Sequence, residues 1–339
     1  AQRRGGRGVR GAQLKVDDVV DHLFVTSTHD WMLFFTNLGR VYRTKAYQLP
    51  DLARDARGQH VANLLAFQPD ETIAEVMVLK DYKQAANLVL ATKSGMVKKT
   101  RLADYDTNRT GGIIAINLKD DDELISAKLV SDDDDLMLIS RKGMSARFKA
   151  DDSTLRPMGR STSGVIGMRF RDGDSLLAMD VVVEGADLVT VTDGGFAKRT
   201  SVDQWATKGR GIMGVRAMKL VEERGALVGA LICQPGDEIF AVASDGVVIR
   251  TRVDEVRVTG RDTMGVSMMR LTGERSLVAV ARAAELDDEP DESEDTAADS
   301  PENVAPESAE GNDGAEQSEP VEPSAAVDSS PEESGKEEN

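Results

Sequence analysis

Short apolar runs alternate with polar turns along most of the chain, at a spacing typical of strands. Runs of four or five apolar residues, as in "WMLFF" (31–35), "LVLA" (88–91), "LMLI" (136–139) and "LVTV" (188–191), each precede a polar segment that contains glycine. Glycine adopts the positive φ that tight turns need, and a second segment with alternating apolar and polar positions follows each turn. The pattern predicts β-hairpins, and no stretch of residues 1–284 has a sustained helical period.

The hairpin recurs five times with a period near fifty residues. The copies are "TNLGRVYRT" (36–44), "TKSGMVKKT" (92–100), "SRKGMSARF" (140–148), "TDGGFAKRT" (192–200) and "SDGVVIRT" (244–251). Their turn glycines are Gly39, Gly95, Gly143, Gly195 and Gly246, at spacings of 56, 48, 52 and 51 residues. A strand-rich repeat of this length predicts a propeller-like or solenoid architecture.

A second element recurs in phase with the hairpins, six times. It reads "GVRGAQL" (8–14), "GQHVANL" (58–64), "GIIAINL" (112–118), "GVIGMRF" (164–170), "GIMGVRAM" (211–218) and "TMGVSMM" (263–269). One more apolar strand lies between the two elements, as in "DHLFVTS" (21–27) and "IAEVMVL" (73–79). Each repeat therefore supplies about four strands, with five full repeats and a sixth that lacks its outer hairpin.

These repeats predict an all-β, six-bladed ring of four-stranded blades over residues 1–284. A closed ring leaves no exposed sheet edges, and terminal strands could complete its last blade. An open all-β solenoid is the alternative architecture.

The charge is divided unevenly along the chain. Residues 285–339 contain 21 Asp and Glu and a single basic residue, Lys336, so this segment carries −20 of the net −17 and the rest carries +3. The segment is rich in Pro, Ser, Ala and Glu, and cannot bury enough apolar surface to offset the entropy of ordering. We expect a folded domain at 1–284 and a disordered acidic tail at 285–339.

Little in the composition suggests catalysis, metal binding or a membrane. The chain has four tyrosines, three histidines and one cysteine: Tyr42, Tyr47, Tyr82, Tyr105, His22, His29, His60 and Cys233. They show neither metal-ligand spacing nor a nucleophile motif, and no phosphate-binding loop is present. The single cysteine and the lack of a long apolar run or signal sequence favour a cytoplasmic protein without cofactor or metal.

A basic residue stands four positions after each turn glycine. These residues are Arg43, Lys99, Arg147, Arg199 and Arg250, and nearby basic residues are Lys45, Lys98, Arg101, Lys149, Lys198 and Arg252. On a ring, the common offset predicts a belt of positive charge, which is typical of a track for a polyanion. Strand-edge protection by solvated charge is the alternative.

Duplex DNA is the natural polyanion, because its charge follows a continuous path. The sequence contains no recognition helix with zinc ligands and no basic leucine zipper. We therefore expect contacts to phosphates, without reading of the base sequence.

The heptapeptide "QRRGGRG" at residues 2–8 completes this picture. It comprises Gln2, Arg3, Arg4, Gly5, Gly6, Arg7 and Gly8. Followed by repeats of about fifty residues, it resembles the box that marks the C-terminal domain of the A subunit of DNA gyrase, a type IIA topoisomerase of bacteria. The resemblance covers residues 1–284. Arginines grip phosphates through forked hydrogen bonds, and glycines let the backbone approach the duplex.

The resemblance implies a six-bladed β-pinwheel whose neighbouring blades exchange strands and whose rim bends DNA into a positive wrap. The wrap would give gyrase its ATP-dependent negative supercoiling. The implied partners are duplex DNA, the gyrase B subunit, and the N-terminal cleavage domain of the same polypeptide, in an A2B2 enzyme at the nucleoid. ATP and Mg would bind elsewhere in that enzyme, so this chain is expected to be non-catalytic alone, and a monomer.

Residues 207–214, "TKGRGIMG", resemble a degenerate second box. Lys208, Gly209, Arg210 and Gly211 are candidates for another DNA contact, or belong to an ordinary linker between blades. The competing families are the topoisomerase IV C-terminal domain, in which the box is usually degraded, and a propeller that serves as a platform for protein interaction.

Overall fold

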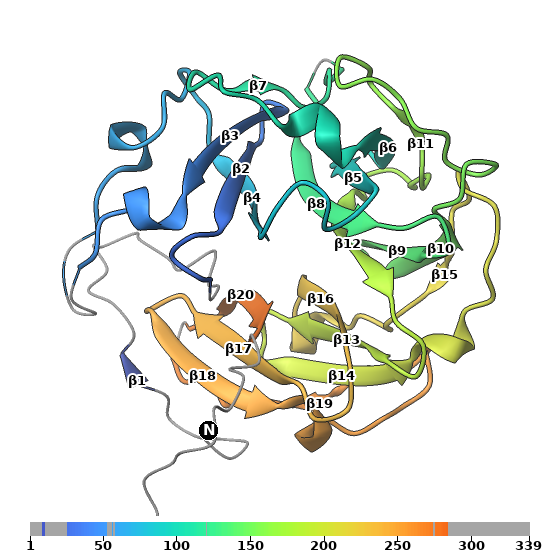
Figure 1. The fold of residues 1–339 in the computed structure, drawn as a ribbon. Coiled ribbons are helices and arrows are strands. Elements are labelled where there is room, and N and C mark those ends of the chain that lie inside the picture. The colour runs from blue at the N-terminus through green and yellow to red at the C-terminus, as the bar shows by residue number, and fades with distance from the viewer. Residues whose placement is uncertain are drawn as a thin grey trace, which may run out of the picture. The chain divides into compact units, whose positions relative to one another are not determined.

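The computed structural model describes residues 9–10, 26–52, 56, 58–119, 121–273 and 275–283. Over these residues the chain forms five four-stranded antiparallel sheets around a common centre (Figure 1). From the centre outward, the first sheet is β4 (Ile73–Leu79), β2 (Trp31–Thr36), β3 (Arg40–Lys45) and β7 (Ile113–Ile114); the second is β8 (Leu124–Val130), β5 (Asn87–Thr92), β6 (Met96–Arg101) and β11 (Val165–Ile166); the third is β12 (Leu176–Val182), β9 (Asp135–Ser140), β10 (Met144–Lys149) and β15 (Val215–Arg216); the fourth is β16 (Leu227–Cys233), β13 (Asp187–Thr192), β14 (Phe196–Ser201) and β19 (Val266–Ser267); the fifth is β20 (Leu277–Arg282), β17 (Glu238–Ala243), β18 (Val247–Arg252) and β1 (Val9–Arg10). The all-β, propeller-like prediction with repeated four-stranded blades is confirmed.

All five predicted hairpins form, and each turns at its predicted glycine. The φ angles of these glycines run from 74° at Gly39 to 84° at Gly95, in the left-handed region that favours glycine. The turn at Gly39 is also crowded, because a Cβ there would lie 2.6 Å from the carbonyl oxygen of Ile116. Glycine therefore permits both the turn and the close approach of the chain that follows β7.

The outer strand of each sheet comes from a different repeat. β7 lies between β6 and β8 in the sequence, yet Ile113 pairs with Val41 of the first sheet. β11, β15 and β19 likewise pair with the hairpins of the preceding sheets. The cycle closes at β1, where Val9 pairs with Val248 of the last hairpin. The exchange of strands between neighbouring blades is present, and a terminal strand completes the fifth sheet.

The prediction of six blades is wrong for the part of the chain that the structure describes, which contains five. Each sheet is built on a hairpin, and each of the five hairpins already has an outer strand. The second element at 58–64 therefore has no described hairpin to join, and it contains a 3-10 helix, η2 (Val61–Asn63), where a strand was expected. The apolar segment at 21–27 lies mostly outside the described residues.

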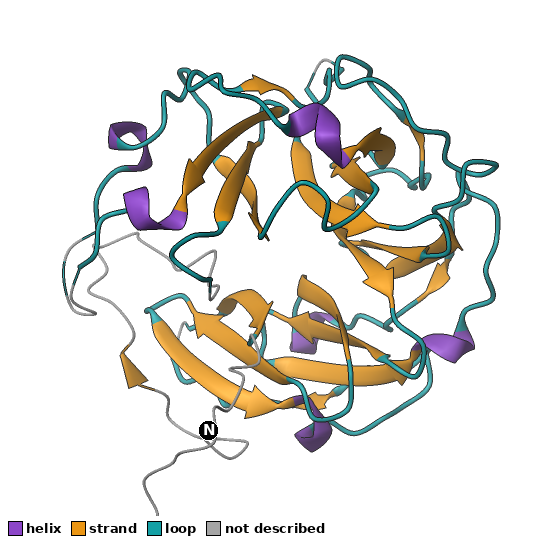
Figure 2. Cartoon of the chain, viewed as in Figure 1, coloured by secondary structure: helices purple, strands orange, loops and turns teal. Residues whose placement is uncertain are grey.

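Short 3-10 helices lie in the connections outside the sheets (Figure 2). Besides η2, those described are η1 (Ala46–Gln48), η3 (Leu102–Tyr105), η4 (Val202–Gln204), η5 (Glu222–Arg224) and η6 (Val253–Glu255). η3, η4 and η6 directly follow the hairpins of the second, fourth and fifth sheets, as η1 follows that of the first. No helix among the described residues is long and apolar enough to cross a bilayer.

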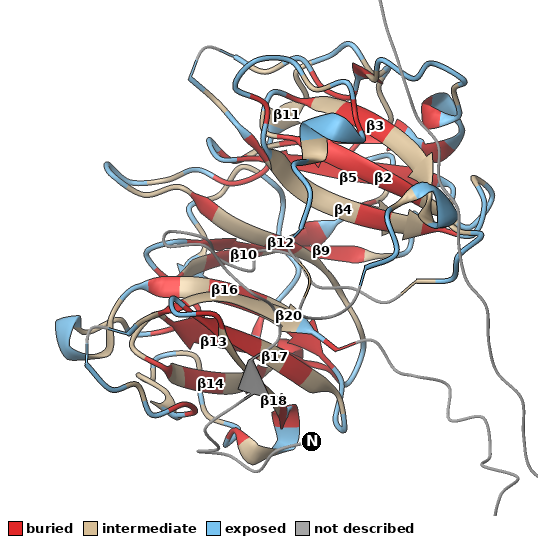
Figure 3. Cartoon of the chain, turned by 90° about the vertical axis from the view of Figure 1, so that its left-hand side faces the viewer, coloured by how far each residue is buried: buried red, intermediate tan, exposed pale blue. Residues whose placement is uncertain are grey.

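The core lies between neighbouring sheets. Strand β5 is buried along its whole length, because Leu88 and Leu90 pack against the first sheet while Val89 and Ala91 pack against the third (Figure 3). β9 and β13 are buried on both faces in the same way. At the centre, the inner strands β4, β8, β12, β16 and β20 pack against one another in sequence. Face-to-face packing leaves the connections and outer strands at the periphery, where a large ligand could reach them.

Candidate nucleic-acid interface

The basic residues at the common offset lie on the third strand of each sheet, but they are not free. Three of them pair diagonally across the hairpin with the acidic residue that begins the second strand. Arg147 Nε lies 2.7 Å from Asp135 Oδ2, Arg199 Nε lies 3.3 Å from Asp187 Oδ2, and Arg250 pairs with Glu238. A diagonal pair of opposite charges stabilises a sheet. The belt of unpaired charge is therefore not what these three positions form.

The other two residues at this offset are held in related ways. Arg43 lies 4.3 Å from the ring of Trp31, the diagonal residue of the first sheet, and its Nη1 lies 2.7 Å from Asp106 Oδ1. Lys99 is fully buried, and its Nζ lies 2.5 Å from Asp132 Oδ1 and 2.8 Å from Asp152 Oδ1. The strand position is thus a site of internal ion pairs, which tie the strand to connecting segments.

Two further residues of the predicted belt are also buried. Lys98 is 0% exposed and Lys198 is 1% exposed. The Lys98 Nζ donates to the carbonyl oxygens of Ala115 and Arg160, and the Lys198 Nζ to those of Gly260 and Arg261. The expectation that Lys98, Lys99 and Lys198 form part of an exposed belt is wrong, because chain segments distant in sequence fold over them.

The remaining predicted residues are more accessible. Arg101, Lys149, Lys208, Arg210 and Arg252 are exposed, and Lys45 is half-buried. The Lys45 Nζ donates to the carbonyl oxygen of His29 and lies 4.0 Å from the Trp31 ring. Arg210 donates from Nε to the Thr154 carbonyl oxygen and from Nη1 to that of Ile166, which orients its side chain. The box at Gln2, Arg3, Arg4, Gly5, Gly6, Arg7 and Gly8 lies outside the described residues, as does the tail at 285–339.

A second series of arginines lies in the linkers that lead to the outer strands. Arg109 stands four residues before β7, and Arg160, Arg210 and Arg261 stand five residues before β11, β15 and β19. Arg109 and Arg210 are exposed, and Arg160 and Arg261 are half-buried. We call the outer strands and these linkers the rim. The linker arginines were missed as a series, although the sequence signals three of them by Gly-Arg pairs at 159–160, 209–210 and 260–261.

The same spacing occurs in the box. Arg4 stands five residues before Val9, the first residue of β1, as Arg160 does before Val165. Gly8 and Gly164 each immediately precede the outer strand. In sequence, the box is therefore a copy of the linker element, enriched in arginine.

Further exposed basic residues flank the linker arginines. They are Lys119, Arg156, Arg169, Arg171, Lys219, Arg257 and Arg270. Acidic residues also occur on the rim, but several of them pair with basic residues. Asp106 and Asp254 bind Arg43 and Arg199, and Arg216 Nη1 lies 2.5 Å from Asp262 Oδ1, where its hydrogen bond lowers the pKa of the Asp262 carboxyl. Internal pairing of acids leaves the linker arginines as the positive groups that face outward.

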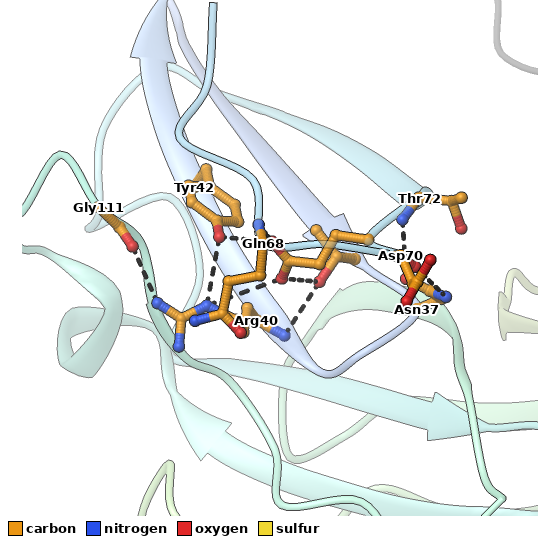
Figure 4. A network of polar contacts seen from close by, with 9 residues as sticks. Asn37, Arg40, Tyr42, Gln68, Asp70, Thr72 and Gly111 are labelled. Atoms are coloured by element: carbon orange, nitrogen blue, oxygen red, sulfur yellow. Dashed lines mark hydrogen bonds and ion pairs between the residues drawn. The ribbon is translucent and has the colours of Figure 1, made fainter. Parts of the chain in front are cut away.

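One network shows how a linker is fixed (Figure 4). Arg40 Nη2 donates to the carbonyl oxygen of Gly111 at 2.8 Å, in the linker that leads to β7. The same side chain is held by Tyr42, whose hydroxyl donates to the buried carboxylate of Glu71 at 2.6 Å. Burial, and then the hydrogen bond to Glu71, raise the pKa of Tyr42. This tyrosine is therefore a structural group in the first sheet.

The centre of the ring is a poor site for a polyanion. A cavity of 430 Å³ lies among the inner strands, and its charged lining residues include Glu75, Lys128, Asp180 and Arg282. Two are acidic and two are basic, and Lys128 Nζ lies 3.6 Å from Glu75 Oε2. Among the described residues, no group of three or more His, Cys, Asp or Glu could hold a metal ion. The described charge pattern therefore favours the rim.

Comparison with known proteins identifies the architecture. The profile described as "DNA gyrase C-terminal domain, beta-propeller" matches residues 1–27, 30–80, 86–131, 134–182, 186–234 and 237–284. The chain belongs to this family. The six matched segments follow the sequence repeat, and the first of them contains the box.

The relatives of the chain include gyrase A subunits of other bacteria. The A subunit of DNA gyrase from Streptomyces coelicolor is 61% identical over 297 residues, which cover 86% of this chain and 35% of that protein. The corresponding gyrase protein of Mycolicibacterium smegmatis is 54% identical over 305 residues, which cover 89% of this chain and 36% of that protein. The chain thus spans about a third of the length of these relatives.

Two solved structures are similar in fold. A DNA gyrase A C-terminal domain superposes with a TM-score of 0.75 at 28% identity, covering 84% of this chain and 92% of that one. The C-terminal domain of a DNA topoisomerase IV superposes with a TM-score of 0.66 at 25% identity, covering 75% and 79%. The family expected from the box and the repeats is confirmed.

Proposed function

We propose that this chain binds duplex DNA without regard to base sequence, bends it, and wraps it with positive writhe around the rim. One observation carries the proposal: a linker arginine recurs at nearly the same place before four successive outer strands. These residues are Arg109, Arg160, Arg210 and Arg261. A repeated cationic group on successive sheets matches the repeated phosphates of a bent duplex.

The physical demands of bending support contacts from several sheets. Smooth bending of a 20–30 base-pair segment by 40–90° costs on the order of 1–6 kcal/mol, and a longer wrap costs more. A single arginine–phosphate contact contributes about 1.5–3 kcal/mol at most. Successive linker contacts, with the box Gln2–Gly8 fastening one end of the arc, would together offset the cost of the bend.

The gyrase relatives suggest the setting in which the wrap acts. We propose that the chain works with the cleavage domain of the same polypeptide and with the gyrase B subunit in an A2B2 enzyme. The wrap would make ATP-dependent supercoiling negative, while ATP and Mg bind outside this chain and strand cleavage occurs elsewhere. A topoisomerase IV C-terminal domain is the alternative within the class, since its fold is also similar.

Salt dependence of DNA binding tests the rim. We would change Arg109, Arg160, Arg210 and Arg261 together to Ala in the full chain, and use Lys80→Ala with Lys83→Ala as the control. Lys80 and Lys83 are exposed but lie in the turn between β4 and β5, away from the linkers. The slope of log affinity against log salt should shrink by about 0.9 for each phosphate that is no longer bound, and only in the rim variant. Equal slopes in the wild type and the rim variant would overturn the proposal.

A further inference from the structure

Two buried lysines hold the linkers of alternate sheets. Lys98 on β6 and Lys198 on β14 occupy equivalent positions, three residues after the turn glycines Gly95 and Gly195. Both side chains are essentially inaccessible, at 0% and 1% exposure. A buried ammonium group is costly unless its hydrogens are satisfied, so its partners indicate what it does.

Those partners are backbone carbonyls of the linkers. The Lys98 Nζ lies 2.5 Å from the Arg160 carbonyl oxygen and 3.4 Å from that of Gly159, and it also donates to Ala115. In the fourth sheet, the Lys198 Nζ lies 2.9 Å from the Gly260 carbonyl oxygen and 2.5 Å from that of Arg261. Each ammonium therefore binds both residues of a Gly-Arg pair.

We propose that Lys98 and Lys198 are positioning residues for DNA binding: each ammonium group fixes the backbone of a Gly-Arg pair and thereby sets the linker arginine on the rim. This proposal rests on the proposed function. Packing alone does not require lysine here, because the equivalent positions in the third and fifth sheets are Ala146 and Ile249. The geometry that Lys98 and Lys198 share is that of a cation at two adjacent carbonyl dipoles, which an apolar side chain cannot reproduce.

The environments of the two lysines make their charge sensitive to pH. Burial, with the nearby Arg160 guanidinium, lowers the pKa of Lys98 to about 7 against a weaker opposing effect of Asp104. Tyr105 also faces this site, where its hydroxyl donates to the Ala115 carbonyl oxygen. Burial lowers the pKa of Lys198 to about 8, with Asp262 opposing the shift and Arg261 adding to it. Loss of these protons removes the charge that binds the carbonyls, so DNA affinity should fall as pH rises through this range.

Paired substitutions and a pH series test the positioning role in the full 339-residue chain. We would measure binding to a fluorescent duplex between about pH 6.5 and 9 for the wild type and for Lys98→Met with Lys198→Met. The wild type should lose affinity about 3- to 10-fold over this range, on the scale of one or two weak contacts. The double variant should bind weakly and with little pH dependence throughout. Thr200→Val is the matched control, because Thr200 is buried on β14 near Lys198 in sequence and its Oγ1 has no hydrogen-bond partner among the described residues.

A double-mutant cycle separates positioning from general damage to the fold. Lys98→Met should weaken binding in the wild-type background but have little further effect beside Arg160→Ala, because the arginine that it positions is already absent. Additive effects in the cycle, or a wild-type affinity that does not change over the pH series, would overturn the positioning role. Failure of the wild type to bind duplex DNA at any pH would instead refute the proposed function.

Discussion

Arg160 Nη1 donates a hydrogen bond to the carbonyl oxygen of Ile114 at 3.0 Å. The linker of the second sheet is thereby joined to the outer strand of the first. Arg210 makes the equivalent bond to Ile166 of the next sheet, at 3.1 Å. Each of these guanidinium groups uses part of its donor fork within the protein, which orients the rest of the fork at the rim.

This geometry predicts that charge and shape contribute separately at Arg160. Arg160→Ala should reduce the salt slope of DNA binding by about 0.9, because one phosphate is no longer bound. Arg160→Lys should preserve the slope but weaken affinity, because a lysine lacks the planar fork that can bind Ile114 and a phosphate together. Fluorescence anisotropy over a range of salt concentrations measures both effects. Identical affinity of the lysine variant and the wild type would show that fork geometry is unimportant.

The strand arginines should matter to stability before they matter to DNA. Arg147 binds Asp135, which is 7% exposed, and also donates to the carbonyl oxygens of Val202 and Trp205. Arg147→Met leaves this carboxylate with fewer partners and should lower the free energy of unfolding by about 2–4 kcal/mol. Urea unfolding measures this loss. Arg156→Met, at an exposed linker arginine, is the control and should change the free energy by less than about 0.5 kcal/mol.

The pH dependence of stability should carry the signature of the two buried lysines. Their folded pKa values of about 7 and about 8 lie below the ordinary 10.5, so the folded state binds fewer protons than the unfolded state between these values. Stability from these groups therefore rises with pH from about 7 toward 10.5, by at most about 1.4 kcal/mol per pH unit for each lysine.

Urea unfolding at a series of pH values checks this sign. Lys98→Met with Lys198→Met should remove the rise, so the wild type should gain stability relative to the variant as pH increases. Parallel curves for the two proteins would contradict the assigned pKa shifts.

The acidic tail should compete with DNA for the rim. Residues 285–339 carry −20, and a tethered polyanion has a high effective concentration near the domain. Removal of residues 286–339 should tighten DNA binding at low salt and have less effect at high salt, where charges are screened. Equal affinities at low salt would indicate a tail that contributes only solubility.

The hairpins could be predicted because their signals are local. An apolar run, a glycine and an alternating strand determine each turn, and the glycine at position 39 meets both a positive φ and a close carbonyl. Strand exchange followed only from the family resemblance. The failure at 58–64 has a non-local cause, since an outer strand forms only where another repeat offers a hairpin edge.

The candidate site was harder to predict for the same reason. Lys98 looks like a solvent-facing residue of an alternating strand, but the linker at 159–160 folds over it from about sixty residues away. Arg147 and Asp135 are twelve residues apart, and their diagonal pairing could have been found from the register of the hairpin. Three linker arginines were visible in the sequence as Gly-Arg pairs before outer strands, although the more regular strand offset drew attention from them.

The sign of DNA writhe tests the central claim most directly. The chain would be bound to relaxed circular DNA, a relaxing topoisomerase added, and the linking number of the purified DNA measured. We predict that positive writhe is trapped by the wild type, and that little is trapped when Arg3, Arg4 and Arg7 are changed to Ala, although this variant still binds DNA. Trapping of no writhe or of negative writhe by the wild type would contradict the account, even if the chain binds DNA tightly.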